Sequence, residues 1–309
     1  MQNEMENTYE IITNENEFEN LENNTFKGKV PQMINSRIVF KGTNNLLYCE
    51  RDVVLENCNL CFHYDNSIIY LSKSKRNYRV NISVHYDSLV YIGRHNYIKD
   101  NINIIASEGK HVVIGTGGLY SDNITIRTAD PHLIYRAKDK KRLNYSKNVF
   151  IGDHVWIGQN VFVLKGTCIG SGSIIGAASV LSSKKVPSNT SFAGNPAKMI
   201  GKDIFYDKTS VHHFTKEDTK NSKFYGAENP DPDFDPNKFL YEYAEDEQFD
   251  FSSIDKPMRS TSIKKKLEFI KEEISKKPYK NRFFVPLPKE QKKNLVYYIR
   301  KFLRRIIGI

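Results

Sequence analysis

The sequence predicts a mainly β protein organised around a β-helix. Between Ile151 and Val186 the chain divides into blocks of six residues. Each block opens with an aliphatic residue, and glycine follows it in four of the six blocks; the opening residues are Ile151, Ile157, Val163, Ile169, Ile175 and Leu181. A six-residue period fits neither an amphipathic helix nor the strict alternation of a half-buried strand.

Each block can supply one short strand and one turn, with the aliphatic side chain facing inward and glycine where the backbone turns. Three such strands close a triangular coil of about eighteen residues, so the six blocks make two coils. One coil cannot bury its own inward residues, so coils must stack on one another. We therefore expect a solenoid whose core is a ladder of aliphatic side chains.

The chain up to residue 203 divides into an N-terminal arm and the β-helix domain that contains these blocks. Residues 1–27 are acidic and poor in apolar periodicity, so we expect a disordered stretch or an edge arm. Residues 28–203 form the predicted β-helix domain. Short β-prone runs between Ile38 and Val90 suit irregular early coils, and the six-residue register returns at Ile92, Ile98, Ile104, Ile114, Tyr120 and Ile126.

One long interruption separates Ile126 from the regular blocks. It runs from Arg127 to Asn148, which is 22 residues, and it contains Asp130, Pro131 and His132. Insertions in solenoids become loops on one face, often the functional face. After Leu181 the run VPSNTSFAGNPAKMIG leaves the register, and we expect it to cap the open end of the coils.

The remaining residues predict a C-terminal extension with two parts. Residues 204–255 are rich in Tyr, Phe and Asp, which indicates an extended or weakly helical segment. Residues 256–309 hold 17 Lys and Arg against 4 Asp and Glu. Apolar residues recur there at helical spacing, which predicts two basic amphipathic helices, around Ile263–Ile274 and around Leu295–Ile307.

Composition narrows the classes of function. The net charge of +10 belongs to the basic tail, so the coils have no nucleic-acid signature and we expect no nucleic-acid partner. No apolar run is long enough for a transmembrane helix, and the acidic amino terminus is the opposite of a signal peptide. Four cysteines make no disulfide framework. We expect a protein of the reducing cytoplasm.

His132 is the first candidate for chemistry, because an imidazole can accept a proton near neutral pH, as a general base must. Asp130 precedes it by two residues and is a candidate to orient the ring. The alternative is a loop histidine that contacts only solvent.

Trp156 and His154 are candidates for binding a substrate. Trp156 is the single tryptophan of the chain and ends its block beside a corner, where it could offer a flat face to a sugar. Packing between subunits is the alternative role, because aromatic side chains are enriched at interfaces. His154 falls two residues earlier, and we expect it either on a side of the prism or in the same cleft as His132.

A run of small residues could let a long thin ligand lie against the coils and reach backbone N–H groups; it comprises Gly176, Ala177, Ala178 and Ser179. Lys184, Lys185 and Lys198 could meet phosphates as point charges near the end of the coils. Tight packing at a corner and a solvated charge cluster are the respective alternatives. Cys58 and Cys61, with Cys49 and His63 nearby, could form a zinc site, but no second pair of ligands follows at the spacing of a zinc finger, so we expect no metal.

The residues from Ile151 to Ile200 closely resemble those of the hexapeptide-repeat acyltransferases, especially bacterial sugar and capsular-polysaccharide O-acetyltransferases. The likeness covers roughly Tyr86–Gly201, and it rests on the repeat, the histidine loop and the GNPAK ending in the family's order. It implies a left-handed parallel β-helix with an inserted catalytic loop. It also implies a homotrimer that holds acetyl-CoA between neighbouring subunits. Nothing in the composition predicts the left-handed crossover, which departs from the usual rule for parallel strands.

The resemblance assigns roles to individual residues. His132 matches the catalytic histidine, and Trp156 matches a tryptophan that lines the acceptor site. Gly176–Ser179 match a stretch that contacts the arm of coenzyme A, and the segment matching its nucleotide end comprises Asn195, Pro196, Ala197 and Lys198. Proline precedes the histidine here, whereas many family members carry it afterwards, so the shape of the loop and the acceptor can differ.

The function expected from this resemblance is acetyl transfer to a sugar hydroxyl of a bacterial surface polysaccharide or its precursor. An N-acetyltransferase of a nucleotide-linked amino sugar would use the same coenzyme A site. A non-catalytic β-helical scaffold would not need the long interruption that carries His132. The basic helix Leu295–Ile307 also has the pattern of an interfacial helix, which suggests contact with the inner face of the plasma membrane, although packing on a neighbouring subunit is equally compatible.

Overall fold

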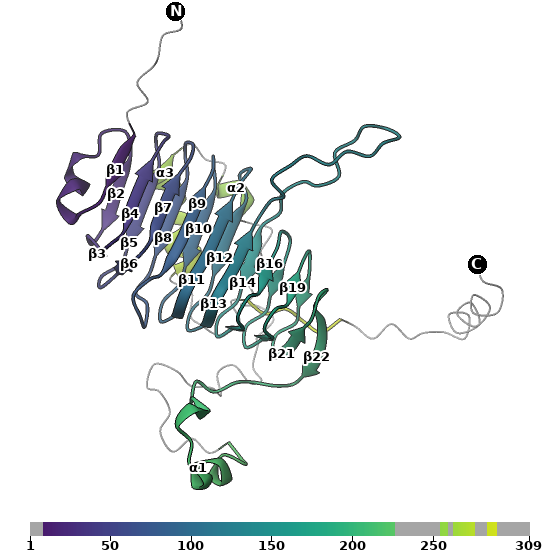
Figure 1. Cartoon of the computed structure of the whole chain (residues 1–309). Helices are drawn as coiled ribbons and strands as arrows, with labels where there is room; N and C mark the ends of the chain where they lie inside the picture. Colours follow the sequence, from purple (N-terminus) through teal and green to yellow (C-terminus); the bar gives the residue numbers. More distant parts are fainter. Residues whose placement is uncertain (1–8, 226–253, 259–261, 276–282, 289–309) are drawn as a thin grey trace, which may run out of the picture.

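The structure is a computed structural model, and it describes residues 9–225, 254–258, 262–275 and 283–288. It is a parallel β-solenoid, and this confirms the predicted β-helix (Figure 1). The strands stack coil on coil, so residues of one coil pair with residues of the coils on either side. The long axis of the solenoid runs from β1 to β22.

The described strands are β1 (Glu10–Ile12), β2 (Thr25–Gly28), β3 (Gln32–Ile34), β4 (Arg37–Phe40), β5 (Leu46–Cys49), β6 (Val54–Glu56), β7 (Asn59–Phe62), β8 (Ile68–Leu71), β9 (Val80–Val84), β10 (Leu89–Ile92), β11 (Tyr97–Ala106), β12 (His111–Ile114), β13 (Leu119–Arg127), β14 (Val149–Ile151), β15 (Trp156–Ile157), β16 (Phe162–Val163), β17 (Cys168–Ile169), β18 (Ile174–Ile175), β19 (Val180–Leu181), β20 (Lys185–Val186), β21 (Thr190–Ala193) and β22 (Lys198–Lys202). The described helices are the 3₁₀ segments Glu15–Asn20 and Val211–His213, α1 (Lys216–Asn221), α2 (Asp255–Met258), α3 (Ile263–Phe269) and a π-helical turn, Ile270–Ser275.

Within the described residues the strands form three sheets. An eight-stranded sheet runs β2-β5-β8-β10-β12-β14-β17-β20, and a twelve-stranded sheet covers most of the other two sides of the prism. The long strand β13 pairs with both β15 and β16 of the next coil. The two short strands therefore continue, with a corner between them, the surface that one long strand covers in the earlier coils.

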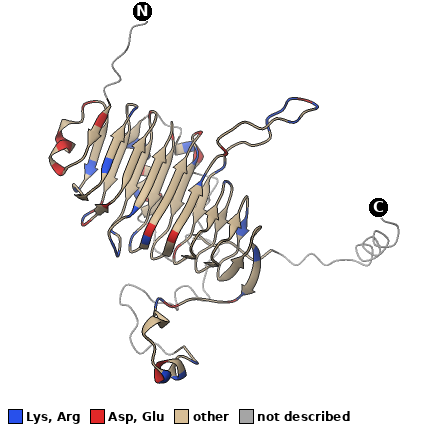
Figure 2. Cartoon of the chain, viewed as in Figure 1, with Lys and Arg blue, Asp and Glu red and all other residues tan. Residues whose placement is uncertain are grey.

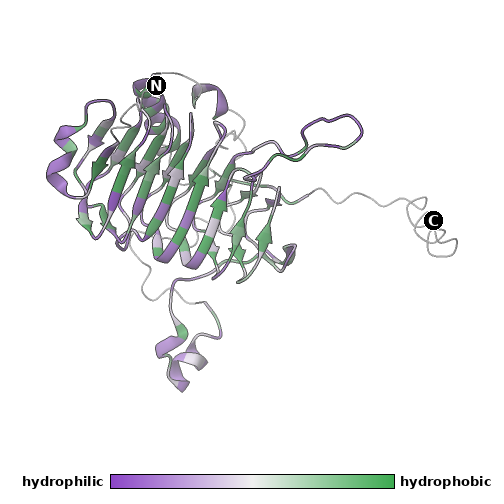
Figure 3. Ribbon diagram, turned by 45° about the horizontal axis from the view of Figure 1, so that its top comes forward, coloured by the Kyte–Doolittle hydropathy of each residue, from purple (hydrophilic) through white to green (hydrophobic). Residues whose placement is uncertain are grey.

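The aliphatic ladder forms the core, as predicted. The six opening residues of the regular blocks are all at most 1% exposed. The six earlier register positions, from Ile92 to Ile126, are also buried. Figure 3 shows the apolar strands and the polar turns between them. These side chains belong to one continuous apolar core. Burial of each contributes roughly 1.5–3 kcal/mol to the stability of the fold.

The corners of the coils place one residue in the left-handed conformation; it is most often asparagine in the early coils and varies in the later ones, as at His154, Asn160, Gly166, Gly172 and Ala178. Asn44 and Asn66 have φ of 53° and 62°, a left-handed conformation that asparagine tolerates better than most residues. Their side chains also connect successive coils, since the amide of Asn44 donates to Asn66 Oδ1 at 2.6 Å. Asn101 and Asn123 repeat this contact at 2.6 Å. These asparagine pairs therefore connect the corners of successive early coils.

The N-terminal region closes the first coil. β1 pairs antiparallel with β4, and Phe18 of the 3₁₀ segment is buried. The first strand of the eight-stranded sheet, β2, begins at Thr25, inside the region expected to be an arm. The edge-arm interpretation therefore fits Glu10–Ile12, while the solenoid starts three residues earlier than the boundary at 28.

The C-terminal tail returns to the solenoid and covers the outer face of the eight-stranded sheet. Side chains of α2, α3 and the π-helical turn pack there, namely Met258, Ile263, Leu267, Ile270 and Ile274, against outward-facing Leu46, Ile68, Tyr70, Leu89, Tyr91, Val113 and Phe150. The first predicted amphipathic helix is therefore confirmed, with its apolar side on the protein's own sheet. The helix predicted around Leu295–Ile307 lies outside the described residues.

The buried Lys266 fixes α3 to the coils. Its side chain is 1% exposed, and its ammonium donates to the carbonyl of Asn66 at 2.6 Å and to Asp87 Oδ1 at 3.1 Å. Burial lowers the pKa of Lys266, although Asp87 opposes this effect. No helix in the described parts of the chain is long and apolar enough to cross a membrane.

Candidate active site

The interruption Arg127–Asn148 leaves the solenoid as a projecting hairpin (Figure 1). Tyr135 and Arg142 form an antiparallel bridge within it. His132 is exposed, as are the residues that follow it up to Lys141. From 136 to 142 the hairpin carries five basic residues and one acidic residue, which Figure 2 shows along its far end. The structure thus presents His132 on an arm that extends away from the chain's own core.

Two ion pairs hold the base of this hairpin on the coils. Arg142 donates to Glu108 at 2.7 Å and 2.8 Å, and Ser146 also donates to this carboxylate. These bonds, that of Arg142 above all, lower the pKa of Glu108 to about 2. On the other strand of the hairpin, Lys165 donates to Asp130. The two pairs connect the hairpin to the coil below it and to the coil above it.

Asp130 serves the hairpin's base and not the His132 ring. Its carboxylate accepts from Lys165 and, at 3.1 Å, from the amide of Asn144. These partners, Lys165 first, lower the pKa of Asp130. Asn144 also donates to the carbonyl of His132 at 2.7 Å and accepts from the backbone N–H of Ile134 at 2.9 Å. The carboxylate of Asp130 thus bonds to Lys165 and Asn144, and Asn144 in turn bonds to the backbone of His132.

His154 is not in a cleft with His132. It is 1% exposed with φ of 50°, and its ring stacks on Tyr206 with centroids 4.0 Å apart. Its Nε2 lies 3.0 Å from the carbonyl of Tyr206. Burial lowers the pKa of His154 to about 3, so the ring is neutral. Tyr206 covers the ring, so in this arrangement His154 lies in the wall of the prism and is not open to a substrate.

Trp156 begins β15 and remains 37% exposed. Its ring centroid lies 5.7 Å from that of Tyr206, and its strand pairs with Leu119 on one side and Ile174 on the other. The indole is thus partly covered by Tyr206 and partly open. Such a half-open aromatic ring is suited to stacking on a flat apolar partner.

The small-residue run lies at the corner between β18 and β19. Ala177 and Ala178 are exposed, whereas Ser179 is buried and donates to the carbonyl of Gly176 at 2.6 Å. A Cβ on Gly176 would lie 3.0 Å from the Cβ of Ala193 in the next layer. Ser179 therefore stabilises the corner, and the two alanines form its open surface.

The GNPAK segment forms the next layer above this corner. Val180 donates to the carbonyl of Gly194 at 3.0 Å, and the N–H of Ala197 donates to the carbonyl of Val180 at 2.9 Å. Asn195, Pro196 and Lys198 are exposed, while Ala197 is buried. The structure therefore brings together the two stretches expected to contact coenzyme A. Small side chains with exposed backbone beside them fit a long thin ligand.

Lys184 and Lys185 lie farther along the coil. Lys184 follows β19, and Lys185 begins β20 of the eight-stranded sheet. They belong to the corner after the one that carries Ala177 and Ala178. Lys198 is nearer, because β22 pairs with β21 so that Lys198 lies opposite Ala193.

One chain does not assemble His132 and Trp156 into a single site. The hairpin enters the eight-stranded sheet through β14, and Trp156 follows β14 after the next corner. The two residues therefore lie at the corners beyond opposite ends of strand β14, with the width of the eight-stranded sheet between them. Ala177 lies at the remaining corner of the prism.

The most informative contacts missing from the sequence analysis involve Lys165, Asn144, Arg142 and Tyr206. Lys165 lies in a turn of the regular blocks, where a lysine is usually exposed to solvent. Tyr206 lies beyond the repeat. No local signal connects them to Asp130 or His154. Among the described residues no group of three or more His, Cys, Asp or Glu could hold a metal ion. Cys58, Cys61 and Cys49 are buried in the coils.

Comparisons with known proteins agree with this geometry. Residues 148–183 match the family model described as bacterial transferase hexapeptide (six repeats). The polySia specific acetyltransferase NeuO, whose crystal structure is known, is 31% identical in sequence to this chain. The match covers 65% of this chain and 93% of that one, with a TM-score of 0.56. The polysialic acid O-acetyltransferase OatWY is 25% identical, with coverages of 65% and 99% and a TM-score of 0.52.

A third structure is that of a hexapeptide-repeat acetyltransferase from Vibrio cholerae O1 biovar eltor, complexed with acetyl coenzyme A. It is 27% identical over 46% of this chain and 72% of that one, with a TM-score of 0.35. No curated protein matches the sequence. The identity to NeuO over nearly all of that chain, together with the matched repeats, identifies this chain as an acyltransferase of the hexapeptide-repeat acetyltransferase family.

Proposed function

We propose that this enzyme is an acetyl-CoA-dependent O-acetyltransferase that acts on a sugar hydroxyl of a bacterial surface polysaccharide or its precursor. The observation that carries the proposal is the 31% identity to the polySia specific acetyltransferase NeuO over 93% of that chain. The likeness to the polysialic acid O-acetyltransferase OatWY supports the same reaction. The exposed His132 and the open ring of Trp156 supply the side chains that the reaction needs.

His132 is the proposed general base. A thioester is already activated, so the protein must remove the proton of the sugar hydroxyl and hold the oxygen against the acetyl carbon. His132 takes that proton as the new C–O bond forms, and it returns the proton to the departing thiolate. General bases of this kind typically contribute about 100-fold or more to the rate. Asn144 and Asp130 hold the backbone that carries His132, as described above.

Acetyl-CoA is the proposed acyl donor. Ala177 and Ala178 would contact its extended arm, with Asn195 and Lys198 nearer to its nucleotide end. Lys184 and Lys185 lie at the following corner, within the same end of the solenoid, where they would add positive charge for the phosphates. The exposed corner, built from small residues in two successive layers, supports this assignment.

A homotrimer with sites between subunits is the proposed assembly. Within one chain, His132 and Trp156 lie at two different corners of the prism, at opposite ends of strand β14. One chain alone therefore leaves the site incomplete. The hairpin carries His132 outward together with exposed apolar side chains, including Leu133 and Ile134 at 55% and 52% exposure. A second copy that receives the hairpin would bury these side chains and place His132 beside its own Trp156.

We also propose a cytoplasmic location, with the helix around Leu295–Ile307 as a contact to the inner face of the plasma membrane. Each basic residue near anionic lipid contributes about 1 kcal/mol, so a trimer would bind such a surface through several weak contacts.

The function is tested by incubating the enzyme with radiolabelled acetyl-CoA and a panel of capsular oligosaccharides, free sugars and nucleotide-linked amino sugars. We expect alkali-labile label on a polysaccharide hydroxyl. Alkali-stable label on an amino sugar would assign N-acetyl transfer, and label on none of the acceptors would remove the proposal.

A further inference from the structure

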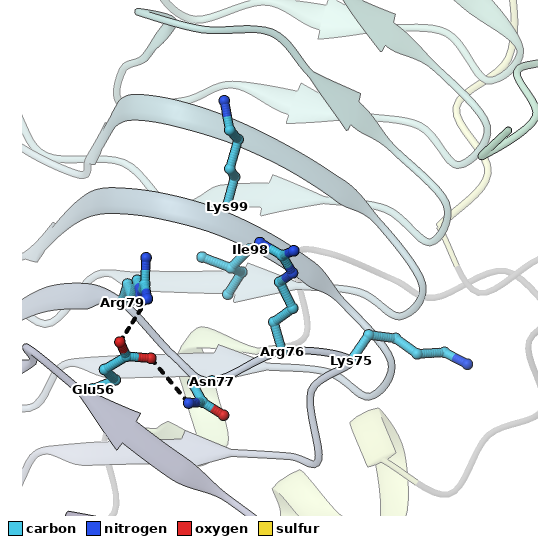
Figure 4. Close-up of a pocket in the computed structure, with 7 residues that line it drawn as sticks. All are labelled: Glu56, Lys75, Arg76, Asn77, Arg79, Ile98 and Lys99. Atoms are coloured by element: carbon cyan, nitrogen blue, oxygen red, sulfur yellow. Dashed lines mark hydrogen bonds and ion pairs between the residues drawn. The ribbon is translucent and has the colours of Figure 1, made fainter. Parts of the chain in front are cut away.

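We propose that a basic hollow on the early coils binds a carboxylate-bearing polysaccharide chain whose reacting sugar lies at Trp156. The inference rests on the proposed function and adds a second binding site for the acceptor. The hollow has a volume of about 410 Å³ and is lined by Glu56, Lys75, Arg76, Asn77, Arg79, Ile98 and Lys99 (Figure 4). Its size lies within the usual range for ligand sites, which is about 300–1,000 Å³.

The lining combines four basic side chains with one carboxylate. Glu56 accepts from Arg79 at 2.5 Å and from the amide of Asn77 at 2.9 Å. Lys99 pairs with Asp122 at 2.9 Å, and its side chain remains 58% exposed. Counting Glu56, Asp122 and the nearby Asp100, the hollow still keeps an excess of positive charge. Residues 1–255 as a whole carry a net charge of −3.

Arg76 is oriented for an anionic ligand. Its guanidinium lies over the ring of Tyr97, with Cζ 4.6 Å from the ring centroid. A cation–π contact uses the flat face of the guanidinium, whereas its N–H donors lie in the plane and point outward. Figure 4 shows Arg76 and Arg79 on either side of Ile98. A planar fork of donors held by an aromatic ring matches the two oxygens of a carboxylate.

The strand register connects this hollow to Trp156. Tyr97 pairs with Leu119, and Leu119 pairs with Trp156. Each step between paired strands is about 4.8 Å, so Tyr97 lies roughly 10 Å from Trp156 along the solenoid. An oligosaccharide of a few units spans this distance. Tyr97, Leu119 and Trp156 are all partly exposed, and together they form an aromatic and apolar strip on which sugar rings can stack.

A second group of charges extends the hollow around the corner. The neighbouring cavity includes Lys29, Arg51, Lys73 and Arg94 among its lining, against Glu50 and Asp52. Lys73 and Arg94 are ion-paired with these acids, at 2.9 Å and 2.8 Å. A long acidic chain that passes the hollow would meet further basic side chains there. A neutral sugar polymer would gain nothing from this lining.

The decisive experiment compares binding of a long sialic acid polymer by the full-length protein and by an Arg76→Gln/Lys99→Gln variant. The matched control removes the same charge from the exposed helix α1 region, as Lys220→Gln/Lys223→Gln. We expect the Kd to rise about tenfold in the first variant, since each exposed ion pair contributes up to about fivefold, and to stay unchanged in the control. Neutral dextran of equal length should bind to neither.

Three outcomes would overturn the inference: unchanged binding in the Arg76→Gln/Lys99→Gln variant, an equal loss in the control, or equal affinity for DNA of the same charge. Thermal unfolding of each variant checks that the coils are intact. For activity, the readout is kcat/KM for the long polymer divided by kcat/KM for a two-sugar acceptor. This ratio should fall about tenfold in the hollow variant alone. Binding is measured without turnover, so failure of acetyl transfer would overturn the function and leave the binding result interpretable.

Discussion

The phenol ring of Tyr206 stacks on the imidazole of His154, with the two ring centroids 4.0 Å apart and the planes within 9°. Tyr206 follows the capping segment, and this contact seals the corner that carries His154. The burial is nearly complete for both residues. A histidine in a regular block of the repeat thus becomes part of the core, and the candidate base is left to the hairpin.

The first prediction concerns acid stability. The pKa of His154 is lowered to about 3 in the folded protein, against an ordinary value of 6.5. Above pH 6.5 the ring is neutral in both states, so stability is unaffected. Below pH 6.5 the unfolded chain binds a proton that the folded chain does not, and stability falls by up to about 1.4 kcal/mol per pH unit until about pH 3.

His154→Asn is the matched variant, because asparagine tolerates the φ of 50° at this position. Urea unfolding at pH 6.5 and pH 5.0 should show that the parent loses about 2 kcal/mol more than the variant over this interval. Equal losses in the two proteins would mean that His154 is protonated in the folded state. Histidines elsewhere contribute to both proteins and cancel in the comparison.

The second prediction concerns His132. His132→Ala should fold and bind acetyl-CoA but transfer acetyl groups at least about 100-fold more slowly, because no base remains to remove the proton from the sugar hydroxyl. The control is His212→Ala, which changes another exposed histidine outside the hairpin. Near-normal turnover by His132→Ala would remove this residue from the mechanism, and the buried His154 could not take its place.

The third prediction concerns the base of the hairpin. Lys165→Met removes the partner of Asp130 and keeps the length of the side chain, so the hairpin should open more often. We expect faster hydrogen exchange of the backbone N–H groups of Ile134 and Leu143, together with a fall in kcat. A catalytically impaired variant with unchanged exchange would show that Lys165 acts on the reaction and not on the position of the hairpin. Lys138→Met, at the far end of the hairpin, is the control.

The fourth prediction concerns the tail helix on the eight-stranded sheet. Ile270 is fully buried against this sheet, so Ile270→Asp places a charge among apolar side chains and should cost about 3 kcal/mol or more. We expect a lower Tm and binding of a hydrophobic dye to the uncovered sheet. Lys264→Asp puts the same acid on the exposed side of α3 and should leave both measurements near the parent values.

The fifth prediction concerns the membrane. A chain ending at Pro288 lacks the segment Leu295–Ile307, which the sequence predicts to be a basic helix, but keeps Phe283, whose carbonyl accepts from the N–H of Ser171 at 3.1 Å. Full-length protein should float with liposomes that contain anionic lipid, and the truncated protein should not. Equal flotation of both proteins, or of neither, would end the membrane hypothesis and favour a role of this helix in assembly.

The sequence alone was sufficient where one residue type repeats at one spacing. The aliphatic positions from Ile151 to Leu181 each fall inside the prism because every coil imposes the same geometry on them. The early coils were harder to predict, since glycine follows fewer of their inward-facing positions and their strands are longer. Their coil boundaries depend on pairing with the neighbouring coil, which no short window of sequence contains.

The same reasoning separates the predictable and unpredictable parts of the site. His132 and Trp156 stand out locally, one by its place in an interruption and the other by being the only tryptophan. The surroundings of Asp130 and His154 could not be predicted, because their partners Lys165 and Tyr206 lie 35 and 52 residues farther along the chain. Contacts of this kind depend on which corner each segment reaches.

The change of coil length has a consequence for how copies of this chain can be arranged. In the eight-stranded sheet, Leu46 pairs with Ile68, 22 residues later, whereas Phe150 pairs with Cys168, 18 residues later. Four fewer residues shorten the perimeter of a coil by about 13 Å. The solenoid is therefore a tapered prism, wide at its amino-terminal end and narrow where Trp156 and Ala177 lie. If copies of this chain touch along their sides, as in the proposed homotrimer, their axes would converge toward the narrow end, and the wide ends with their basic hollows would lie farthest from the shared axis.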